Sequence, residues 1–168
     1  MKLGSFDAII AALNAAKVRH LVVGGMAVNA HGYLRFTKDV DLVVRLQVGD
    51  ITGAFSALAQ LGYKPLVPIT VGQFADPAQR DRWRTERGMV VLQLWSDQHK
   101  ETPINLFLHE PFDFDAEYER ALVAQSEAGQ EERFASLDTL IRMKEEAGRD
   151  IDLLDVRKLR EIREAEQT

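Results

Sequence analysis

The stretch LVVGG at residues 21–25, followed after a short segment by DVD at residues 39–41, decides the fold that this sequence predicts. A leucine and two β-branched valines predict a short buried strand that ends where the glycines begin. Without Cβ atoms, the glycines let the backbone approach a ligand closely, and the start of a short helix over residues 26–31 would favour an anion. The stretch therefore predicts a strand, a phosphate-binding glycine turn and a helix.

Asp39 and Asp41 flank Val40 at the start of a second apolar run, which predicts another strand over residues 40–44. Side chains two residues apart on a strand point to the same face, so we expect the two carboxylates to project together. Such a pair can hold Mg²⁺, and water and phosphate oxygens then complete the coordination shell of the ion. The pair indicates phosphoryl or nucleotidyl transfer.

Each half of this pattern also has a structural interpretation. Gly-Gly is common in turns, and Asp-x-Asp often occurs at the solvated edge of a strand. Alone, each half is more often structural than functional. The presence of both, in this order, favours the functional interpretation.

The two motifs also resemble a known family. VVGGMAV at residues 22–28, HGY at 31–33 and the segment from Arg35 through Thr37 to DVDL at 39–42 resemble the polymerase-beta-like nucleotidyltransferases. The closest resemblance is to the small toxin branch of the AbiEii/AbiGii type. Near the C-terminus, the closing motif of that branch is matched by LIRMK at residues 140–144, Gly148-Arg149, Asp152 and Asp155.

This resemblance implies an enzyme that moves a nucleoside monophosphate from a nucleoside triphosphate to an acceptor hydroxyl, with Mg²⁺ or Mn²⁺ as cofactor. Asp39 and Asp41 would bind the metal, while Gly24 and Gly25 would cradle the phosphates. The acceptor would be RNA, especially the tRNA 3′ end. A toxin role with an antitoxin protein as partner is implied as well.

The loop before the acidic pair and the C-terminal motif supply further candidate phosphate ligands. Arg35 and Thr37 would pass close to a bound phosphate. Lys144 falls on the inward face of a helix that Ser136 is expected to cap, and its ammonium either neutralises triphosphate charge, with Arg149 as a second contact, or snorkels to solvent. Asp152 and Asp155 lie one turn apart on the next helix, and we expect them to fix Lys144 or Arg149 by ion pairs.

The sequence departs from the family pattern at Asn105. The family places a third carboxylate on this strand, where it is thought to help bind metal and to accept a proton. An asparagine can contact a metal but cannot accept a proton at neutral pH. Glu101, Asp113 and Asp115 are the nearest replacement acids, with Glu101 the better candidate, although ordinary loop acidity explains all three.

Asn105 therefore leaves three functions open. The chain is an active nucleotidyltransferase, a catalytically impaired protein that binds nucleotides or a partner, or an interaction subunit with no nucleotide site. Unchanged thermal stability on addition of Mg²⁺ and nucleotide would favour the third.

Composition restricts the setting in which any of these functions operates. The chain has 168 residues, 46% of them apolar, no cysteine and a net charge of −5. We expect one domain over residues 1–168, a cytoplasmic location and no membrane span, with no overall field that would attract long nucleic acid. A local basic face of Arg80, Arg84 and Arg87 beside Trp83 could bind RNA, but a solvated face with Trp83 packed inward is the favoured interpretation.

The remaining patterns predict a layered α/β fold with a mixed sheet, flanking helices and a C-terminal helical segment over residues 136–168. We expect helices over residues 6–16 and 51–61, capped by Ser5 and Asp50, and a helix from Pro77 capped by Asp76. An irregular connection around residues 65–68, strands over 89–95, 104–108 and 131–134, and a helix over 112–124 complete the prediction. The four histidines, His20, His31, His99 and His109, lack metal-ligand spacing and are expected to be structural.

Overall fold

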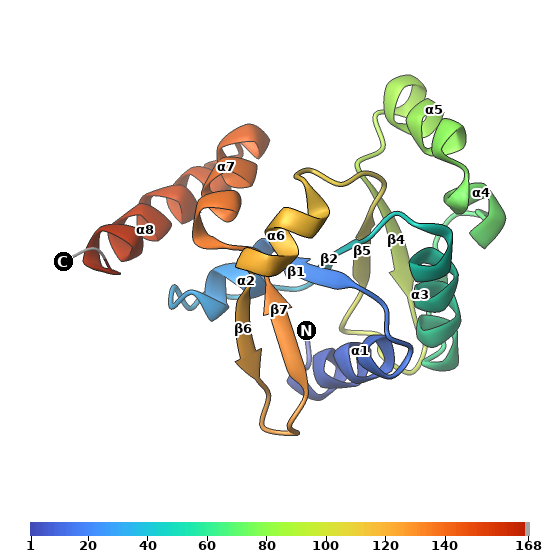
Figure 1. The fold of residues 1–168 in the computed structure, drawn as a ribbon, viewed down its shortest axis with the longest axis horizontal. Coiled ribbons are helices and arrows are strands. Elements are labelled where there is room, and N and C mark those ends of the chain that lie inside the picture. Colours follow the sequence, from blue (N-terminus) through green and yellow to red (C-terminus); the bar gives the residue numbers. More distant parts are fainter. Residues whose placement is uncertain (167–168) are drawn as a thin grey trace.

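The computed structural model describes residues 1–166, which form a seven-stranded mixed sheet flanked by helices (Figure 1). The strand order is β3-β4-β5-β2-β1-β7-β6, and the predicted layered α/β fold with a mixed sheet is confirmed. The strands are β1 (His20–Val23), β2 (Val40–Val44), β3 (Lys64–Pro65), β4 (Val91–Trp95), β5 (Ile104–Phe107), β6 (Leu122–Gln125) and β7 (Glu131–Phe134). The helices are α1 (Leu3–Ala15), α2 (Gly24–Ala30), α3 (Val48–Gln60), α4 (Val71–Ala75), α5 (Pro77–Arg87), α6 (Phe114–Arg120), α7 (Leu137–Ala147) and α8 (Asp150–Glu166).

Three adjacent central strands bring distant parts of the chain into one row. β1 and β2 are antiparallel, with Val23 opposite Asp41. β2 and β5 are parallel, with Asp41 beside Asn105. The end of the first apolar run, the acidic pair and the asparagine therefore meet at one place in the sheet.

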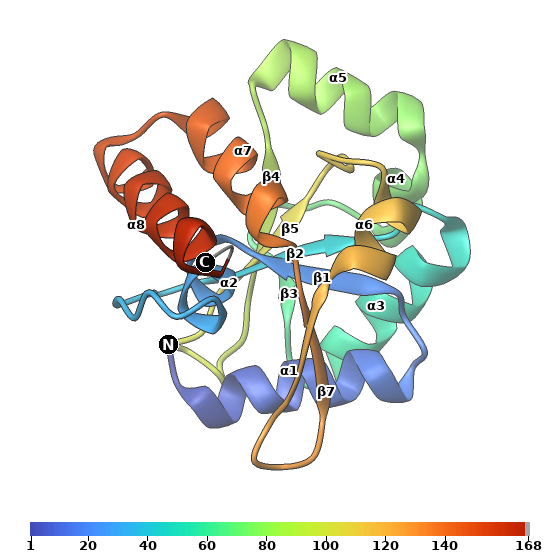
Figure 2. The ribbon, with the colours of Figure 1, turned by 60° about the vertical axis from the view of Figure 1, so that its left-hand side comes forward.

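The two faces of the sheet are covered unequally at this place. Along β4 and β5, fully buried residues alternate with half-buried ones, so that Asn105 and Phe107 share the more open face. Helices α1 and α3 pack together on one side, and the α7–α8 hairpin lies away from them (Figures 1 and 2). The site described below opens on the partly covered face.

The predicted helix over residues 112–124 is wrong in its second half. Helix α6 ends at Arg120, and Leu122–Gln125 forms β6, which pairs antiparallel with β7. Hydrogen bonding to the next strand, in a hairpin closed by residues 126–130, outweighs the local helical pattern here. The irregular connection around residues 65–68 is followed by a short helix that was not predicted, α4, which Thr70 and Gln73 begin with a capping box.

Helix caps were predicted with mixed success. Asp76 accepts a hydrogen bond from the Ala78 N–H at 2.9 Å, as expected. Ser5 lies inside α1, and Asp50 lies in the first turn of α3, where its carboxylate binds Arg45 at 2.7 Å instead of capping the helix. Ser136 precedes α7 but makes no side-chain cap.

The start of α7 is held instead by a fully buried carboxylate, Glu117 of α6. Its two oxygens accept hydrogen bonds from the Ser136 N–H at 2.6 Å and the Thr139 hydroxyl at 2.7 Å. Burial opposes ionisation of Glu117, but these bonds and one from Arg120 outweigh it and lower the pKa of the carboxyl. The helix that carries Lys144 is thereby fixed at its N-terminus.

The basic face on α5 is smaller than predicted. Trp83 is packed inward, as expected, but Arg80 is buried as well and donates to the Phe74 carbonyl. Only Arg84 and Arg87 of the three arginines remain exposed.

Candidate active site

The glycine turn lies directly against the acidic pair. Gly24 has φ +65°, and a Cβ there would lie 1.9 Å from the Asp41 Oδ2. A Cβ on Gly25 would lie 2.5 Å from the Thr37 Oγ1. Helix α2 begins at these glycines, two residues earlier than predicted. Only glycine permits this close approach of the turn to the Asp41 and Thr37 side chains.

The environment of Asp41 changes the pKa of its carboxyl. Burial raises the pKa of its carboxyl and the charge of Asp39 raises it further, whereas the hydrogen bond from Asn105 acts in the opposite direction. That bond joins the Asn105 Nδ2 to the Asp41 Oδ1 at 2.9 Å. Neither aspartate of the pair makes an ion pair within residues 1–166. The charge of Lys144 also acts to lower the pKa of Asp41, but no described protein group forms an ion pair with either aspartate.

This donor set fits a divalent cation. Within the described part of the chain, no three His, Cys, Asp or Glu side chains gather as a metal-binding group, so a bound ion would have two carboxylates as its acidic ligands. Mg²⁺ typically takes one or two protein carboxylates and completes its shell with water and phosphate oxygens. A cation here would also relieve the repulsion that contributes to the raised pKa of Asp41.

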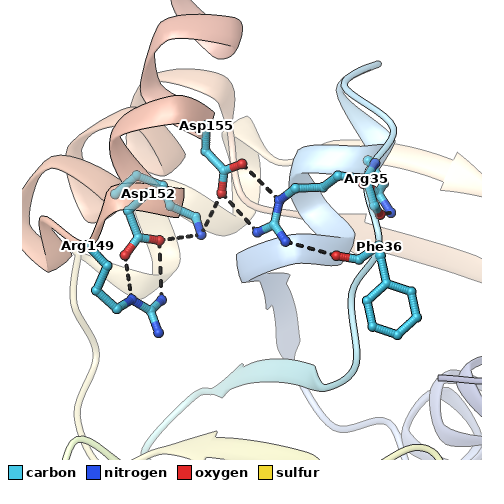
Figure 3. Close-up of polar contacts among 7 residues, drawn as sticks. Arg35, Phe36, Arg149, Asp152 and Asp155 are labelled. Atoms are coloured by element: carbon cyan, nitrogen blue, oxygen red, sulfur yellow. Dashed lines mark hydrogen bonds and ion pairs between the residues drawn. The ribbon is translucent and has the colours of Figure 1, made fainter.

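A second group of charges borders this site, and its members are paired with one another (Figure 3). The Asp155 carboxylate of α8 contacts the Arg35 guanidinium at 2.8 and 2.9 Å, and the Lys144 Nζ at 2.9 Å. The Asp152 carboxylate contacts the Lys144 Nζ at 2.8 Å and the Arg149 Nε at 2.6 Å. We call these five residues the paired network; it ties the loop before Asp39 to α7 and α8.

The paired network is buried at its centre. Both carboxylates have no exposed surface, and the Lys144 side chain is 8% exposed. Burial opposes ionisation of Asp152, but the hydrogen bonds from Arg149 and Lys144 outweigh it and lower the pKa of its carboxyl to about 2. Lys144 does not snorkel to solvent, because its ammonium lies between two carboxylates. The ion pairs expected for Asp152 and Asp155 are present, and Arg35 joins them, which was not expected.

Sequence reasoning missed Asn29, which shapes the loop before the acidic pair. Its side chain accepts a hydrogen bond from the Arg35 N–H at 2.9 Å and donates one to the Arg35 carbonyl at 3.0 Å. Thr37 donates to the Asp39 carbonyl at 3.3 Å. An asparagine inside a short helix carries no signal of such a role, because its partner lies in a loop of irregular structure.

Two adjoining cavities meet at Asp41. The smaller, of about 110 Å³, is lined by Gly24, Lys144 and Arg149 among others. The larger, of about 520 Å³, has Asp41 and Asn105 at one end and extends between β5 and α7. Arg149 borders both.

None of the replacement acids lines these cavities. Glu101 pairs with Lys2 at 2.9 Å on the surface. Asp113 caps α6 through the Ala116 N–H, and Asp115 pairs with Arg19 at 2.7 Å. These contacts agree with ordinary structural roles, and the position beside Asp41 is left to Asn105.

Three histidines make structural contacts. His20 bonds to the Val18 carbonyl, His31 to the Ala135 carbonyl and His99 to the Ser5 hydroxyl, each at 2.9 Å. His109 differs because it lines the larger cavity. Its Nδ1, like the Nε2 of His20, has no hydrogen-bond partner within residues 1–166. Burial and the charge of Arg84 lower the pKa of its imidazole, which favours the neutral ring.

Comparison with known proteins identifies the fold. No family model matches the sequence, and no curated protein matches it. Among solved structures, a lincosamide antibiotic adenylyltransferase, LnuA, with lincomycin bound, aligns over 96% of this chain and 98% of its own, with a TM-score of 0.62 and 14% identity. The chain has a nucleotidyltransferase fold.

Two further structures share this fold. ANT(2″)-Ia in complex with adenylyl-2″-tobramycin aligns over 96% of this chain and 94% of its own, with a TM-score of 0.53 and 13% identity. An antigenic nucleotidyltransferase-like protein from Paracoccidioides brasiliensis aligns over 92% of this chain and 73% of its own, with a TM-score of 0.51 and 15% identity. At such identities the likeness concerns the fold alone, and the resemblance to the AbiEii/AbiGii toxin branch stays a prediction. No helix within the described residues is both long and apolar enough to cross a membrane.

Proposed function

We propose that this chain is a divalent-cation-dependent nucleotidyltransferase that moves a nucleoside monophosphate from a nucleoside triphosphate to an acceptor hydroxyl. One observation carries the proposal. Asp39 and Asp41 hold negative charge without an ionic partner among the described residues, directly against a glycine turn with no room for a Cβ. A divalent cation supplies the positive charge that such a site lacks, and it brings the phosphate oxygens that complete its shell.

Asp39 and Asp41 would hold Mg²⁺ or Mn²⁺, which when bound neutralises phosphate charge and aligns the reacting groups. Backbone N–H groups at the glycine turn would donate to phosphate oxygens, although the Gly25 N–H also bonds to the Asp41 carboxylate. Arg149 borders both cavities and would contact the triphosphate through its exposed guanidinium.

Three residues predicted to contact phosphate would act on the shape of the site instead. Arg35 and Lys144 are already engaged by buried carboxylates, so we assign them to fixing the loop and α7. Thr37 stands against Gly25 and supports the turn. Of the four side chains that the sequence predicted to contact phosphate, Arg149 would therefore make this contact. Arg35, Thr37 and Lys144 would not.

Asn105 would orient Asp41 through its amide and would accept no proton. The proton of the attacking hydroxyl would therefore leave to water in the larger cavity. Loss of a positioned base commonly costs roughly 10²- to 10⁴-fold in rate, so we expect slow transfer. The same residue supports the second candidate function, a protein that binds nucleotide without turnover.

The acceptor and the biological role rest on resemblance. RNA as acceptor, a toxin role and an antitoxin partner follow from the sequence motifs, whereas two of the solved structures with this fold contain lincomycin and adenylyl-2″-tobramycin. Both acceptor classes satisfy the proposed chemistry, since each offers a hydroxyl.

The test is label transfer from each α-labelled nucleoside triphosphate, with Mg²⁺ or Mn²⁺, to total RNA and to a panel of small hydroxyl compounds. Wild type, Asp39→Ala and Asn105→Asp are compared. Transfer by wild type that Asp39→Ala abolishes supports an active enzyme. Transfer by Asn105→Asp alone supports the second candidate, and binding of no nucleotide by wild type contradicts both.

A further inference from the structure

The larger cavity is mostly apolar, although it begins at two polar side chains. Asp41 and Asn105 form its inner end. The remaining wall is dominated by hydrophobic side chains from β4, β5, α7 and the loops beside them, namely Val90, Val91, Phe107, Pro111, Met143 and Ala147. A triphosphate group gains nothing from such a wall, so the wall suits the nucleoside or the acceptor.

The position of this cavity relative to the glycine turn identifies what it can hold. In the sheet, β1 with the turn lies on one side of β2, and β5 with Asn105 lies on the other. Phosphoryl transfer needs the attacking and leaving oxygens roughly in line with the phosphorus. With the leaving phosphates at the turn, the attacking hydroxyl must approach from the side of Asn105, where the larger cavity lies.

On the basis of the proposed function, we propose that this cavity is the acceptor site and that it takes a small, uncharged or positively charged hydroxyl compound with an apolar body. In the reaction, the hydroxyl oxygen forms a bond to the α-phosphorus, the bond from that phosphorus to the pyrophosphate oxygen breaks, and the hydroxyl proton leaves to water. Polynucleotide is the acceptor class that this proposal excludes.

Size supports a small molecule. The cavity volume of about 520 Å³ falls within the range of roughly 300 to 1,000 Å³ typical of small-molecule sites. Apolar lining with few polar groups is also typical of such sites, because hydrophobic contact supplies affinity and the polar groups fix orientation. A strand of RNA needs an open groove with cationic side chains along its backbone.

Charge at the cavity wall also favours a small molecule over RNA. Glu146 is an exposed carboxylate of this wall, and its charge acts on the His109 imidazole. Arg149, the arginine of this wall, is held by Asp152 at 2.6 Å. A phosphodiester close to Glu146 would be repelled, whereas an amine would be attracted. The His109 Nδ1, which has no hydrogen-bond partner in the described part of the chain, offers one hydrogen bond to a polar group of the ligand.

Val90→Trp tests the assignment, because Val90 lines only the larger cavity and is 53% exposed, so that the fold can accept the larger side chain. Val123→Trp is the matched control on β6, at 45% exposure and lining neither cavity. Each variant and wild type receive α-labelled nucleoside triphosphate with host-cell total RNA or with a low-mass, ultrafiltered extract of the same cells. Binding of Mg²⁺ and a non-hydrolysable nucleoside triphosphate is measured in parallel as a shift in thermal unfolding midpoint.

We expect wild type and Val123→Trp to label a low-mass compound and no RNA, and Val90→Trp to lose this labelling at least roughly tenfold while its nucleotide-induced shift is unchanged. Labelling of RNA, equal labelling by Val90→Trp, or no labelling with nucleotide binding intact would each overturn the acceptor assignment. Absence of any nucleotide-induced shift in wild type would instead overturn the proposed function, so the two failures are distinguishable.

Discussion

Two pairs of aspartates lie within the same site and differ in their partners. Asp152 and Asp155 are fully buried and bound by Lys144, Arg35 and Arg149 at 2.6 to 3.2 Å. Asp39 and Asp41 have no ionic partner in the described residues, and burial together with mutual repulsion raises the pKa of Asp41. The chain supplies ion-pair partners for Asp152 and Asp155 but not, among the described residues, for Asp39 and Asp41.

This difference indicates that one pair of aspartates supports the structure of the site and that the other binds a ligand. Charges that the protein neutralises by itself stabilise a geometry, because their ion pairs exist before any ligand arrives. Charges left without a partner cost folding free energy unless a ligand supplies the opposite charge. We infer that α8 and the paired network hold the loop and the turn, while the acidic pair would hold the cation that in turn binds the phosphates.

The largest effect is expected from breaking the unneutralised pair. Asp39→Ala should reduce nucleotidyl transfer by roughly 10³-fold, because a metal ligand acts on charge that develops during the reaction. The measurement is label transfer from a nucleoside triphosphate. Asp81→Ala, which removes an exposed carboxylate on α5, is the control and should leave the rate unchanged; equal loss in both variants would contradict the assignment.

Breaking the neutralised pair should cost stability. Lys144→Met leaves two buried carboxylates without their shared ammonium, which typically lowers the free energy of unfolding by about 3 to 5 kcal/mol. Urea denaturation measures this change. Lys158→Met is the matched control, since Lys158 pairs with Glu161 at 2.8 Å on an exposed surface, and such pairs contribute about 1 kcal/mol or less. Similar losses in the two variants would show that the network is not the support we describe.

Low pH should weaken the paired network by protonating Asp152. Its pKa of about 2 in the folded chain lies below the roughly 3.9 of an unfolded aspartate, so its stabilisation is full above pH about 4 and is lost as the pH falls towards 2. The shift corresponds to about 2 to 3 kcal/mol. Denaturation curves between these pH values, for wild type and Asp152→Asn, should converge as the pH falls. Parallel curves would show that Asp152 does not carry this dependence.

The contact between the turn and the acidic pair can be isolated with two glycines of the same backbone conformation. Gly24 has φ +65°, and a Cβ added there would lie 1.9 Å from the Asp41 Oδ2, whereas Gly88 has φ +62° and its added Cβ would meet nothing within 4 Å. Alanine at either position incurs about 1 to 2 kcal/mol for the left-handed backbone. Gly24→Ala should lose about 1 to 3 kcal/mol more in urea denaturation, because Asp41 must move. Equal losses would mean that the turn does not need to contact Asp41.

The outline of this site was predictable from sequence because its pattern is local. The apolar run before Gly24 and the alternation around Asp41 specify strand ends and side-chain direction, and the structure places both motifs at adjacent positions of β1 and β2. Gly148, with φ +63°, follows the last residue of α7 and ends it as a helix-terminal glycine commonly does.

The parts that sequence could not give depend on contacts between distant segments. Residues 122–125 form a strand by pairing with β7, which itself lies beside the distant strand β1. Glu117 reaches α7 from another helix. Arg35 was expected near phosphate, yet a carboxylate on α8 engages it. Each outcome depends on which side chains meet in three dimensions, which helical or strand periodicity does not encode.

The most direct test of the central claim measures the thermal unfolding midpoint of wild type and Asp41→Asn, with and without Mg²⁺ and a non-hydrolysable nucleoside triphosphate. A carboxyl whose folded pKa is raised destabilises the fold once ionised, so without ligand the variant should be at least as stable as wild type. With ligand at about 100 times its Kd, wild type should gain about 2.7 kcal/mol and exceed the variant. A ligand that shifts both proteins equally, or neither, would contradict the claim that this unneutralised pair is the metal and nucleotide site.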